Sequence, residues 1–543
     1  MSVIQATLIA LAYAFARASF NAGLGWYVLS QPLVAGTIAG LLLGDPLRGA
    51  ALGGALNLAT LALSHLKLSL EPDIALVGYV GVPLLLFGGL DANSPQATVV
   101  LAALVGLGGL LHFLRNIGNT MLAHWADYFA DGGEFAAISV INVILAQAWL
   151  FALSFIPALL LLRLDQSMVL DALRDIPAWV QQTLQLSQYL LAALGIAMSL
   201  RLIMQGSAIA YFVLGWLVAQ WLGLVPATMF GASIAIVHAY LARKRMESNK
   251  DMLVPDALPS DQSGDDLESP RTLSPASLAS SFFLWMFFHD AGQNFERGQH
   301  MGFATALTPI GQQVSDTLLE RAAFLRRHLT LFVSDWPVGG LLVGATAALE
   351  ERRANGDAIS EAEFAGAKTS VMASLSVLGN VVLIGVITRL FVAIGANLAQ
   401  RPSLLGPLFF IIAESIVVLG IAVLCFQFGY RQTRHWAIWM RESDWLRAGL
   451  FGAVRLGTFV LGALLIVYVP LRMPETAHIT IGEATLWLQP LLDQFAPHIL
   501  SLSLTLWLWW QLRYRRANDM TLMLLCLFGA FALSYLASVT GWV

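Results

Sequence analysis

The stretch AAISVINVILAQAWLFALSFIPALLLL, from Ala136 to Leu162, contains no charged residue. A helix needs roughly 20 apolar residues to cross the hydrocarbon core of a bilayer, and this stretch is longer than that. The alternating pattern of a membrane barrel is absent, so backbone polar groups must be satisfied within helices. The sequence therefore predicts an all-α polytopic membrane protein. Similar apolar runs recur at Tyr189–Leu200, Ala208–Ala242, Pro407–Phe428, Leu450–Val469 and Met520–Val539.

Composition supports this class and excludes others. The 543 residues are 57% hydrophobic and 12% charged, with a mean hydropathy of +0.71, which is too apolar for a soluble globule. The first basic residue, Arg17, lies inside the first apolar segment, so we expect no cleaved export signal. The sequence has no basic patch with interleaved aromatic residues, of the kind that binds nucleic acid. Cys425 and Cys526 lie in apolar runs without metal-ligand spacing, so we expect buried thiols, no metal site and no cofactor.

One charged segment interrupts the apolar pattern. Residues 243–276 read RKRMESNKDMLVPDALPSDQSGDDLESPRTLSPA, a composition that buries too little apolar surface to fold. It predicts a flexible linker over residues 244–276 between two membrane modules, residues 1–243 and 277–543. The basic start of this segment, next to a long apolar run, places it on the cytoplasmic side.

Two further segments of the second module combine dense charge with helical apolar spacing. These are SDTLLERAAFLRRHLTLF (residues 315–332) and ALEERRANGDAISEAEFAGAK (residues 348–368). Both predict amphipathic surface helices, the second interrupted by a loop at ANGDAIS. Such helices form either a docking face for a soluble partner or a solvated surface, and the pattern does not choose between them.

The first module carries polar residues between two apolar runs, in LSHLKLSLEPDIALVGYVGVPLLL (residues 63–86). Pro72 breaks any helix there. The segment is either a water-exposed loop or a broken, re-entrant helix that lines a polar cavity. The ionisable residues concerned are His65, Lys67, Glu71 and Asp73.

The preceding segment, GTIAGLLLGDPLRGAALGGALNLATLAL (residues 36–63), is rich in glycine. The glycines allow close approach of helix backbones, and GDPLRG predicts a turn. Asn57 lies in the second apolar part of this segment. It either faces a cavity or bonds another helix.

The richest polar stretch is FFHDAGQNFERGQHMGF, from Phe287 to Phe303. Carboxylates and amides presented together suit a ligand with several hydroxyl groups, because they accept and donate in fixed directions. A structural charge patch at the membrane surface is the alternative. In a helix, one face would carry Asp290, Asn294 and Arg297, and the adjoining face Gln293, Glu296 and His300.

Searches for catalytic motifs find little. No phosphate-binding loop, dinucleotide fingerprint or nucleophile elbow is present, and the histidines form no metal-ligand pattern. This absence favours a carrier over a self-contained enzyme.

Several motifs carry a family resemblance. In the second module these are NFERGQHMGF, RRHLTLF, AALEERRANGDAIS, GAKTSVM and LLGPLFFII, and in the first QPLVAGTIAGLLLGD, GGALNLATLAL, PDIAL, ADYFADGGEFAAIS and PAWVQQTL. Their order and spacing resemble the mannose-type (mannose/fructose/sorbose family) sugar phosphotransferase system (PTS), with its membrane components IIC and IID fused in one polypeptide. The IID resemblance covers most of residues 278–540, and the IIC resemblance about residues 1–243.

The resemblance implies a division of labour. IIC and IID form pseudo-symmetric halves of the sugar path in the bacterial cytoplasmic membrane and assemble into trimers of the pair. A soluble IIB protein, which receives its phosphate from IIA, transfers phosphate from a phosphohistidine to the sugar. The resemblance thus implies that this chain carries no catalytic phosphoryl donor.

The resemblance also implies which residues bind the sugar. By matching motif positions these are Asp73 from IIC and Asn294 and Glu296 from IID, with Gln293 where the family usually has an aromatic residue. Asn57 stands where glutamate is common, and His65 stands near the usual asparagine. Further departures are Val28 near the usual glutamine, and Gly379 and Asn380 without the family's Gly-Asp-Pro.

The sequence therefore predicts a sugar-translocating membrane subunit that moves a hexose or amino sugar inward as IIB phosphorylates it. The departures motivate an alternative, a divergent paralogue acting as a membrane sensor, scaffold or facilitator without phosphotransfer.

Overall fold

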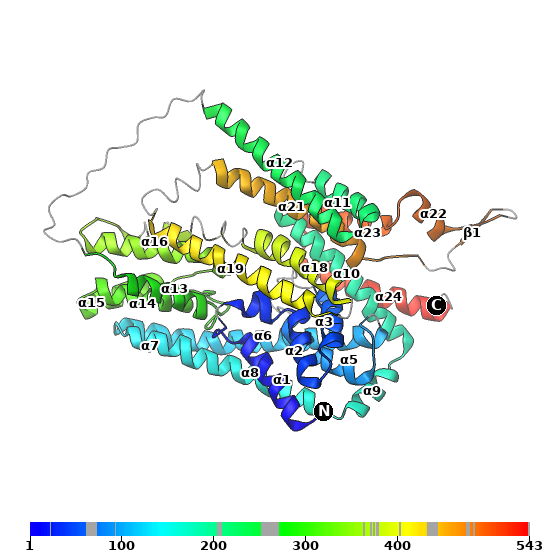
Figure 1. Ribbon diagram of the computed structural model, residues 1–543, viewed down its shortest axis with the longest axis horizontal. Coiled ribbons are helices and arrows are strands. Elements are labelled where there is room, and N and C mark those ends of the chain that lie inside the picture. The colour runs from blue at the N-terminus through cyan, green and yellow to red at the C-terminus, as the bar shows by residue number, and fades with distance from the viewer. Residues whose placement is uncertain are drawn as a thin grey trace.

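The computed structural model places the chain in a bundle of helices drawn in Figure 1. It describes residues 1–540 except 22, 61–72, 93, 204–208, 251–270, 362–363, 367, 370–371, 373–374, 376–378, 401–402, 432–443, 474–477 and 482–483. His65 therefore lies outside the described residues, as does most of the segment predicted as a linker.

The first module is helical, with π-helical turns (η) inserted at several points. Its elements are α1 (Val3–Arg17), η1 (Gly25–Leu29), α2 (Pro32–Leu43), α3 (Pro46–Thr60), α4 (Ile74–Leu76), η3 (Val77–Gly81), α5 (Val82–Gly88), α6 (Pro95–Asp131), α7 (Phe135–Val140), η4 (Ile141–Leu145), α8 (Ala146–Arg163), α9 (Gln166–Arg174), α10 (Ala178–Ile203), α11 (Ile209–Leu222) and α12 (Leu224–Lys250).

The second module adds one short hairpin to its helices. Its elements are α13 (Pro275–Phe288), α14 (His300–Val314), α15 (Leu318–His328), α16 (Trp336–Ala354), η6 (Gly379–Thr388), α18 (Arg389–Gln400), α19 (Leu405–Arg431), α21 (Asp444–Tyr468), β1 (His478–Ile481), β2 (Ala484–Trp487), α22 (Leu488–Phe495), α23 (Ile499–Arg513) and α24 (Asp519–Thr540). The antiparallel pair β1–β2, in the register His478 opposite Trp487, is the one exception to the all-α prediction among the described residues.

Five helices in the described part of the chain are long and apolar enough to cross a membrane: Pro95–Asp131, Phe135–Arg163, Ala178–Arg201, Leu405–Arg431 and Thr521–Val539. The second of these contains the whole Ala136–Leu162 stretch. The prediction of a helical membrane protein is confirmed.

Other apolar runs are broken into shorter helices. The run Ala208–Ala242 forms α11 and α12, which are separated at Gly223, whose φ of +76° only glycine adopts without strain. Helix α12 continues to Lys250, and α13 begins at Pro275. The two ends of the segment predicted as a linker are therefore helical.

Helices α2 and α3 form the hairpin that the glycine-rich segment predicts. The turn follows Gly44, whose φ is +93°, and α3 starts at Pro46. A Cβ atom at Gly53 would lie 2.3 Å from the carbonyl oxygen of Pro32. Only glycine allows this approach, so the glycines act as packing devices between the two helices.

The amphipathic segments of the second module divide differently from the prediction. Helix α15 is an amphipathic helix with a capping box between Thr317 and Glu320. The ALEERR sequence, in contrast, is the charged end of α16, whose preceding turns are buried and apolar. The helix ends at Ala354, where the loop ANGDAIS begins, as predicted.

The two modules are interleaved. Helices α18 and α19 pack on α2 and α3, while α21, α23 and α24 pack on α10, α11 and α12 of the first module (Figure 1). One hydrophobic cluster extends from Tyr27 to Cys526 and contains residues of both modules. Each module therefore needs the other to cover its apolar surface.

Helices α13 and α14 form a hairpin at the start of the second module. They have 14 and 15 residues, so each is about 21–23 Å long, shorter than the roughly 30 Å hydrocarbon core. The irregular segment that joins them, residues 289–299, packs against α6 of the first module. We call residues 289–299 the tip.

Candidate functional site

The tip contains most of the polar stretch that the sequence highlights, but it is not helical. The side-chain Oδ1 of Asn294 accepts hydrogen bonds from the backbone amides of Glu296 (3.1 Å) and Arg297 (3.0 Å). Gly298 follows with a φ of +62°. This Asx turn and the left-handed glycine compete with helix formation. The side chains therefore do not share the two faces expected from helical spacing.

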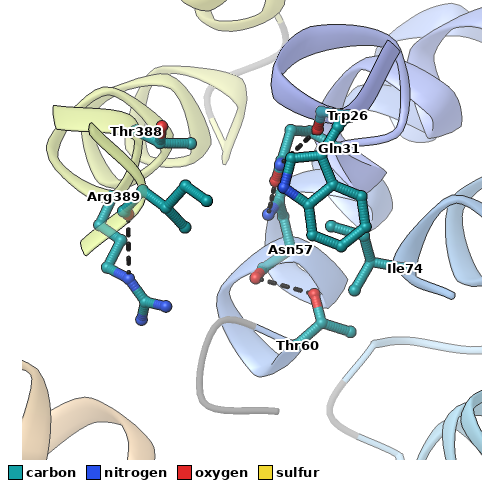
Figure 2. A pocket seen from close by; sticks show the side chains of 8 residues that line it. Trp26, Gln31, Asn57, Thr60, Ile74, Thr388 and Arg389 are labelled. Carbon is teal, nitrogen blue, oxygen red and sulfur yellow. Dashed lines mark hydrogen bonds between the residues drawn. The ribbon is translucent and has the colours of Figure 1, made fainter. Parts of the chain in front are cut away.

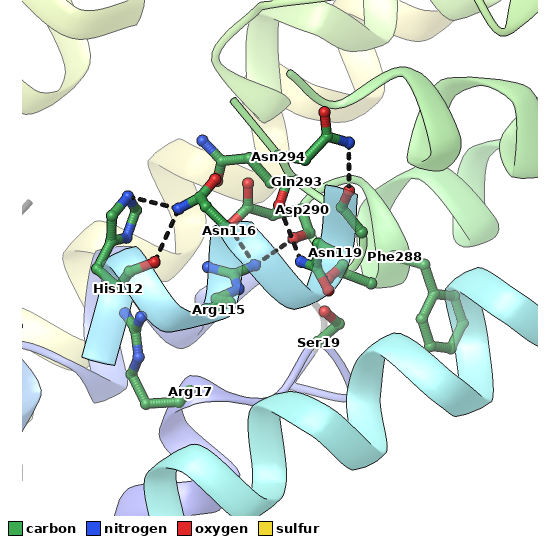
Figure 3. Close-up of polar contacts among 12 residues, drawn as sticks. Arg17, Ser19, His112, Arg115, Asn116, Asn119, Phe288, Asp290, Gln293 and Asn294 are labelled. Carbon is green, nitrogen blue, oxygen red and sulfur yellow. Dashed lines mark hydrogen bonds and ion pairs between the residues drawn. The ribbon is translucent and has the colours of Figure 1, made fainter. Parts of the chain in front are cut away.

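The first module supplies hydrogen-bond donors to some backbone carbonyl groups of the tip and of the α13 end. Side chains of α6 and η4 donate to four carbonyl oxygens (Figure 3 shows those from α6). The bonds join Asn142 to Phe288 (3.1 Å), Arg115 to Asp290, and Asn119 to Ala291 (3.1 Å) and Gln293 (2.8 Å).

Ion pairs fasten the same surfaces. Arg297 makes a two-pronged contact with Asp127 of α6, with Nη1–Oδ1 and Nη2–Oδ2 distances of 2.8 and 2.5 Å. Arg115 pairs with the Asp290 carboxylate at 3.2 Å. Glu296 keeps 47% of its side chain exposed, with His124 Nε2 at 3.5 Å. Of the residues predicted to bind a ligand on the tip, Glu296 has the most accessible polar group.

Asp73 is buried and fully engaged. Its Oδ1 accepts from the backbone amides of Ala75 (3.0 Å) and Leu76 (3.2 Å), so it caps the N-terminus of α4. Its Oδ2 accepts from the hydroxyl of Tyr13 at 2.7 Å and lies 3.1 Å from Nε of Arg17. The carboxylate therefore fixes a helix end.

A small cavity lies between the modules (Figure 2). One wall comes from the first module and the other from η6 and α18 of the second. The lining residues are Trp26, Gln31, Asn57, Thr60, Ile74, Ile384, Thr388 and Arg389.

Amide side chains form a chain along the first-module wall. Gln31 donates to the carbonyl oxygen of Trp26 (3.2 Å) and accepts from Asn57 Nδ2 (3.0 Å). Asn57 Oδ1 accepts from the backbone amide of Leu33 in the first turn of α2 (3.0 Å). Asn57 therefore both bonds another helix and lines the cavity. The side-chain amide nitrogens of Gln31 and Asn57 each have a second N–H for a ligand. The Thr60 hydroxyl donates to the backbone carbonyl of Asn57, so the lone pairs of this hydroxyl can accept from a ligand.

Thr388 of the opposite wall bonds a residue that sequence reasoning missed. Glu414 on α19 is 0% exposed, and its Oε1 accepts from the Thr388 hydroxyl at 2.5 Å. Because Thr388 donates to Glu414, it presents an acceptor to the cavity. A glutamate within the apolar run Pro407–Phe428 was the available signal, since ionisable groups inside membrane segments usually serve a function.

The predicted site residues do not converge on one pocket. Asn57 lines the cavity, and Asp73 adjoins it through its neighbour Ile74, whereas Gln293, Asn294 and Glu296 lie on the tip and do not line it. His65 lies outside the described residues. Within the described residues, no group of three His, Cys, Asp or Glu side chains is placed to hold a metal ion.

The other departures lie in the interface between the modules. Val28 is buried, and the polar side chain beside Asn57 is Gln31 instead. Gly379 packs on the Asp335 side chain, where an added Cβ would come within 2.3 Å of the carboxylate. Of Asn380, only the backbone, in η6, is described.

Comparisons with known proteins match both modules. Residues 272–539 match the family model for the PTS system mannose/fructose/sorbose family IID component, and residues 3–240 match that for the PTS system sorbose-specific IIC component. Over 267 residues the chain is 32% identical to the PTS system sorbose-specific EIID component of Klebsiella pneumoniae, covering 48% of this chain and 95% of the relative. The chain belongs to the mannose/fructose/sorbose family of PTS membrane components.

Two further comparisons involve proteins named for mannose. Over 219 residues, 39% of this chain and 80% of the relative, the chain is 28% identical to the PTS system mannose-specific EIIC component of Escherichia coli strain K12. A cryo-EM structure of the mannose transporter ManYZ in complex with microcin E492 is 29% identical, covers 50% of this chain and 98% of its own, and has a TM-score of 0.30. The two family models and the relatives of both kinds make the chain a IIC half and a IID half in one polypeptide, a membrane component of a sugar PTS.

Motifs of the IID half meet in a charged cluster at the end of α16. Glu350 Oε1 lies 2.7 Å from His328 Nε2 and 2.8 Å from Arg327 Nε. Burial lowers the pKa of His328. Burial opposes ionisation of Glu350, but the bond to His328 and the charge of Arg327 outweigh it, so the pKa of Glu350 lies below its usual range. These motif residues stabilise the α15–α16 contact.

Proposed function

We propose that this chain holds a neutral sugar in the cavity between its IIC and IID halves and releases it inward as a soluble partner phosphorylates it. The observation that carries the proposal is the cavity itself, which both halves line with amide and hydroxyl groups.

The cavity chemistry suits a compound with several hydroxyl groups. Gln31 and Asn57 offer N–H donors, while Thr60 and Thr388 offer oxygen acceptors, because the hydrogen of each threonine hydroxyl is already donated within the protein. Trp26 adds an aromatic face on which the C–H groups of a sugar ring pack.

The residues predicted from the family motifs take distinct roles in this proposal. Asn57 contacts the sugar in the cavity, and Glu296, which does not line the cavity, contacts the sugar as it moves past the tip. Asp73 holds the helix end that carries Ile74 to the cavity wall, and Asn294 shapes the turn that presents Glu296, with Gln293 beside it. His65 is proposed as a further sugar contact from the segment that precedes Asp73.

The partners follow from the family. We propose that IIB, phosphorylated by IIA, supplies the phosphoryl group from a phosphohistidine on the cytoplasmic side, and that the linker and the α15–α16 cluster face this side. We also propose that the chain forms a homotrimer in the bacterial cytoplasmic membrane.

Vesicles containing this protein and loaded with members of a sugar panel test the proposal when phosphorylated IIB is added outside, at the cytoplasmic face. We expect sugar phosphate to form only with the protein present, and Asn57→Ala and Glu296→Ala to lower its formation. Glu134→Gln, at an exposed glutamate without a side-chain cap bond, is the matched control.

Two results would overturn the proposal in different ways. Sugar movement without any sugar phosphate indicates a facilitator that works without phosphotransfer. Unchanged activity in both Asn57→Ala and Glu296→Ala shows that the sugar lies elsewhere.

A further inference from the structure

The tip of the IID half is held by side chains of the IIC half. We propose that Asn119, Asn142 and Arg115 are positioning residues, which set the backbone of the tip and thereby the place of Glu296 on the path of the sugar. This inference rests on the proposed function, because it assigns a purpose to the tip within sugar binding.

The need for these donors follows from the end of α13. The last carbonyl groups of a helix have no partner inside the helix, and in hydrocarbon no water replaces one. Phe288 is the last residue of α13, and its carbonyl oxygen receives an N–H group from the IIC half, as do those of Asp290, Ala291 and Gln293 in the tip. The oxygens of Phe288 and Asp290 also accept from backbone amides of the tip, but among the described residues only the IIC half donates side-chain N–H groups to these four oxygens.

Asn119 makes the most specific of these contacts. Its Nδ2 donates to Ala291 O at 3.1 Å and to Gln293 O at 2.8 Å, so one amide group fixes two carbonyls on either side of Gly292. The side chain is 0% exposed, so water does not substitute for it. The spacing of these two oxygens is thereby set by a single nitrogen atom.

Gly292 leaves room for the side-chain amide of Asn142 beside the tip. A Cβ at this position would lie 2.8 Å from Oδ1 of Asn142 and 2.2 Å from Cε of Met301. The absence of a side chain therefore lets Asn142 reach the carbonyl of Phe288 and lets the tip pack on α14.

The tip transmits this arrangement to Glu296. Gln293, whose carbonyl Asn119 holds, directly precedes Asn294, and Asn294 Oδ1 accepts from the backbone amide of Glu296. Loss of the Asn119 amide therefore shifts the turn that presents the Glu296 carboxylate. We expect the substitution to weaken sugar affinity and not the phosphate-transfer step, because it changes no group that transfers phosphate.

The test uses the full-length protein in lipid nanodiscs and compares Asn119→Ala with Asn116→Ala. Asn116 lies on the same helix and is 2% exposed, and among the described residues its side-chain amide bonds His112 of that helix and no residue of the tip. The first readout is hydrogen–deuterium exchange in the peptide that covers residues 289–299. The second is the KM and maximal rate of IIB-dependent sugar phosphorylation.

We expect Asn119→Ala to speed amide exchange in the tip and to raise KM about tenfold, as fits the loss of two buried hydrogen bonds. The maximal rate should stay within about twofold, and Asn116→Ala should change neither readout. Asn142→Ala removes one bond and is expected to raise KM about threefold, so it serves if Asn119→Ala does not fold.

Unchanged exchange in the tip for both Asn119→Ala and Asn142→Ala would overturn the positioning role. If exchange rises while KM stays constant, the tip is not on the path of the sugar and the inference also falls. Glu296→Ala separates this inference from the proposed function: if it lowers sugar binding while the asparagine variants do not, the site stands and the positioning role is wrong.

Discussion

The hydroxyl of Tyr27 donates to the carboxylate of Asp335 at 2.5 Å and joins the two halves of the protein. Tyr27 belongs to η1 of the IIC half, and Asp335 directly precedes α16 of the IID half. The tyrosine is 1% exposed, and Gly379 packs on the aspartate side chain. The contact is a charge-assisted hydrogen bond in a largely dry interface, where such bonds are strong.

Tyr27→Phe removes this bond and little else. We expect a loss of about 1.5–3 kcal/mol in unfolding free energy, the usual contribution of a hydrogen bond to a charged group. Tyr79→Phe is the control, because the Tyr79 hydroxyl donates to a neutral carbonyl of its own half, Leu29, at 3.3 Å. Denaturant titration of the purified protein should show the larger loss for Tyr27→Phe. Equal losses would show that the cross-half bond has no special strength.

Asp73 should respond differently to two substitutions. Asn caps helices as well as Asp does, so Asp73→Asn keeps the cap on α4 and loses the charge facing Arg17. Asp73→Ala loses both, and leaves Arg17 without this carboxylate in a buried place. Breaking a buried ion pair costs about 3–5 kcal/mol. Thermal melts should rank the wild type above Asp73→Asn and Asp73→Ala lowest, and the opposite order of the two variants would refute the capping role.

The Thr388–Glu414 pair gives a test inside the membrane. Thr388→Val removes the donor to the Glu414 carboxylate, which has no other bond from the described residues. Leaving a buried acceptor unsatisfied costs about 1–3 kcal/mol. Glu414→Gln retains an amide oxygen for the Thr388 hydroxyl, so it should be the milder change. Stability and sugar affinity should be measured together. A change in both would show that the pair shapes the cavity wall, whereas a change in stability alone would show that it contributes only to packing.

Lys368 makes the free energy of unfolding depend on pH in the alkaline range. Burial lowers the pKa of Lys368 from 10.5 to about 8. Between these values the unfolded chain binds the proton and the folded chain does not, so stability rises with pH across this window. The shift corresponds to a change on the order of 3 kcal/mol. Unfolding titrations from pH 7.5 to 10.5 should show this rise in the wild type relative to Lys368→Met, and parallel curves would contradict it.

The membrane helices could be predicted because hydropathy over about 20 residues is a local property of the chain. The uncharged stretch Ala136–Leu162 is one continuous helical span, even though η4 interrupts its regular α-helix. The amphipathic pattern also located α15, where the apolar spacing and the capping box agree. The end of α16 was misjudged because its charged turns extend a buried helix.

The tip could not be predicted from spacing. Helical periodicity placed Asp290, Asn294 and Arg297 on one face, but the Asn294 side chain bonds the backbone ahead of it and Gly298 turns the chain. The partners that hold the tip lie far away in the sequence; Asn119, for example, is 172 residues before Ala291. The cavity pairs residues of both halves in the same way, so only the tertiary fold brings Asn57 and Thr388 to one space.

Hydrogen bonds hold the residues that directly precede α13. The backbone amide of Arg271 donates to Asn355 Oδ1 at 2.6 Å, and that of Leu273 donates to Glu351 Oε1 at 2.7 Å. A covalent connection of this kind replaces an encounter between two polypeptides by a high effective concentration, in the millimolar range for short flexible linkers. The halves are therefore made in a one-to-one ratio and do not separate on dilution, so contacts such as Tyr27–Asp335 form within a single chain.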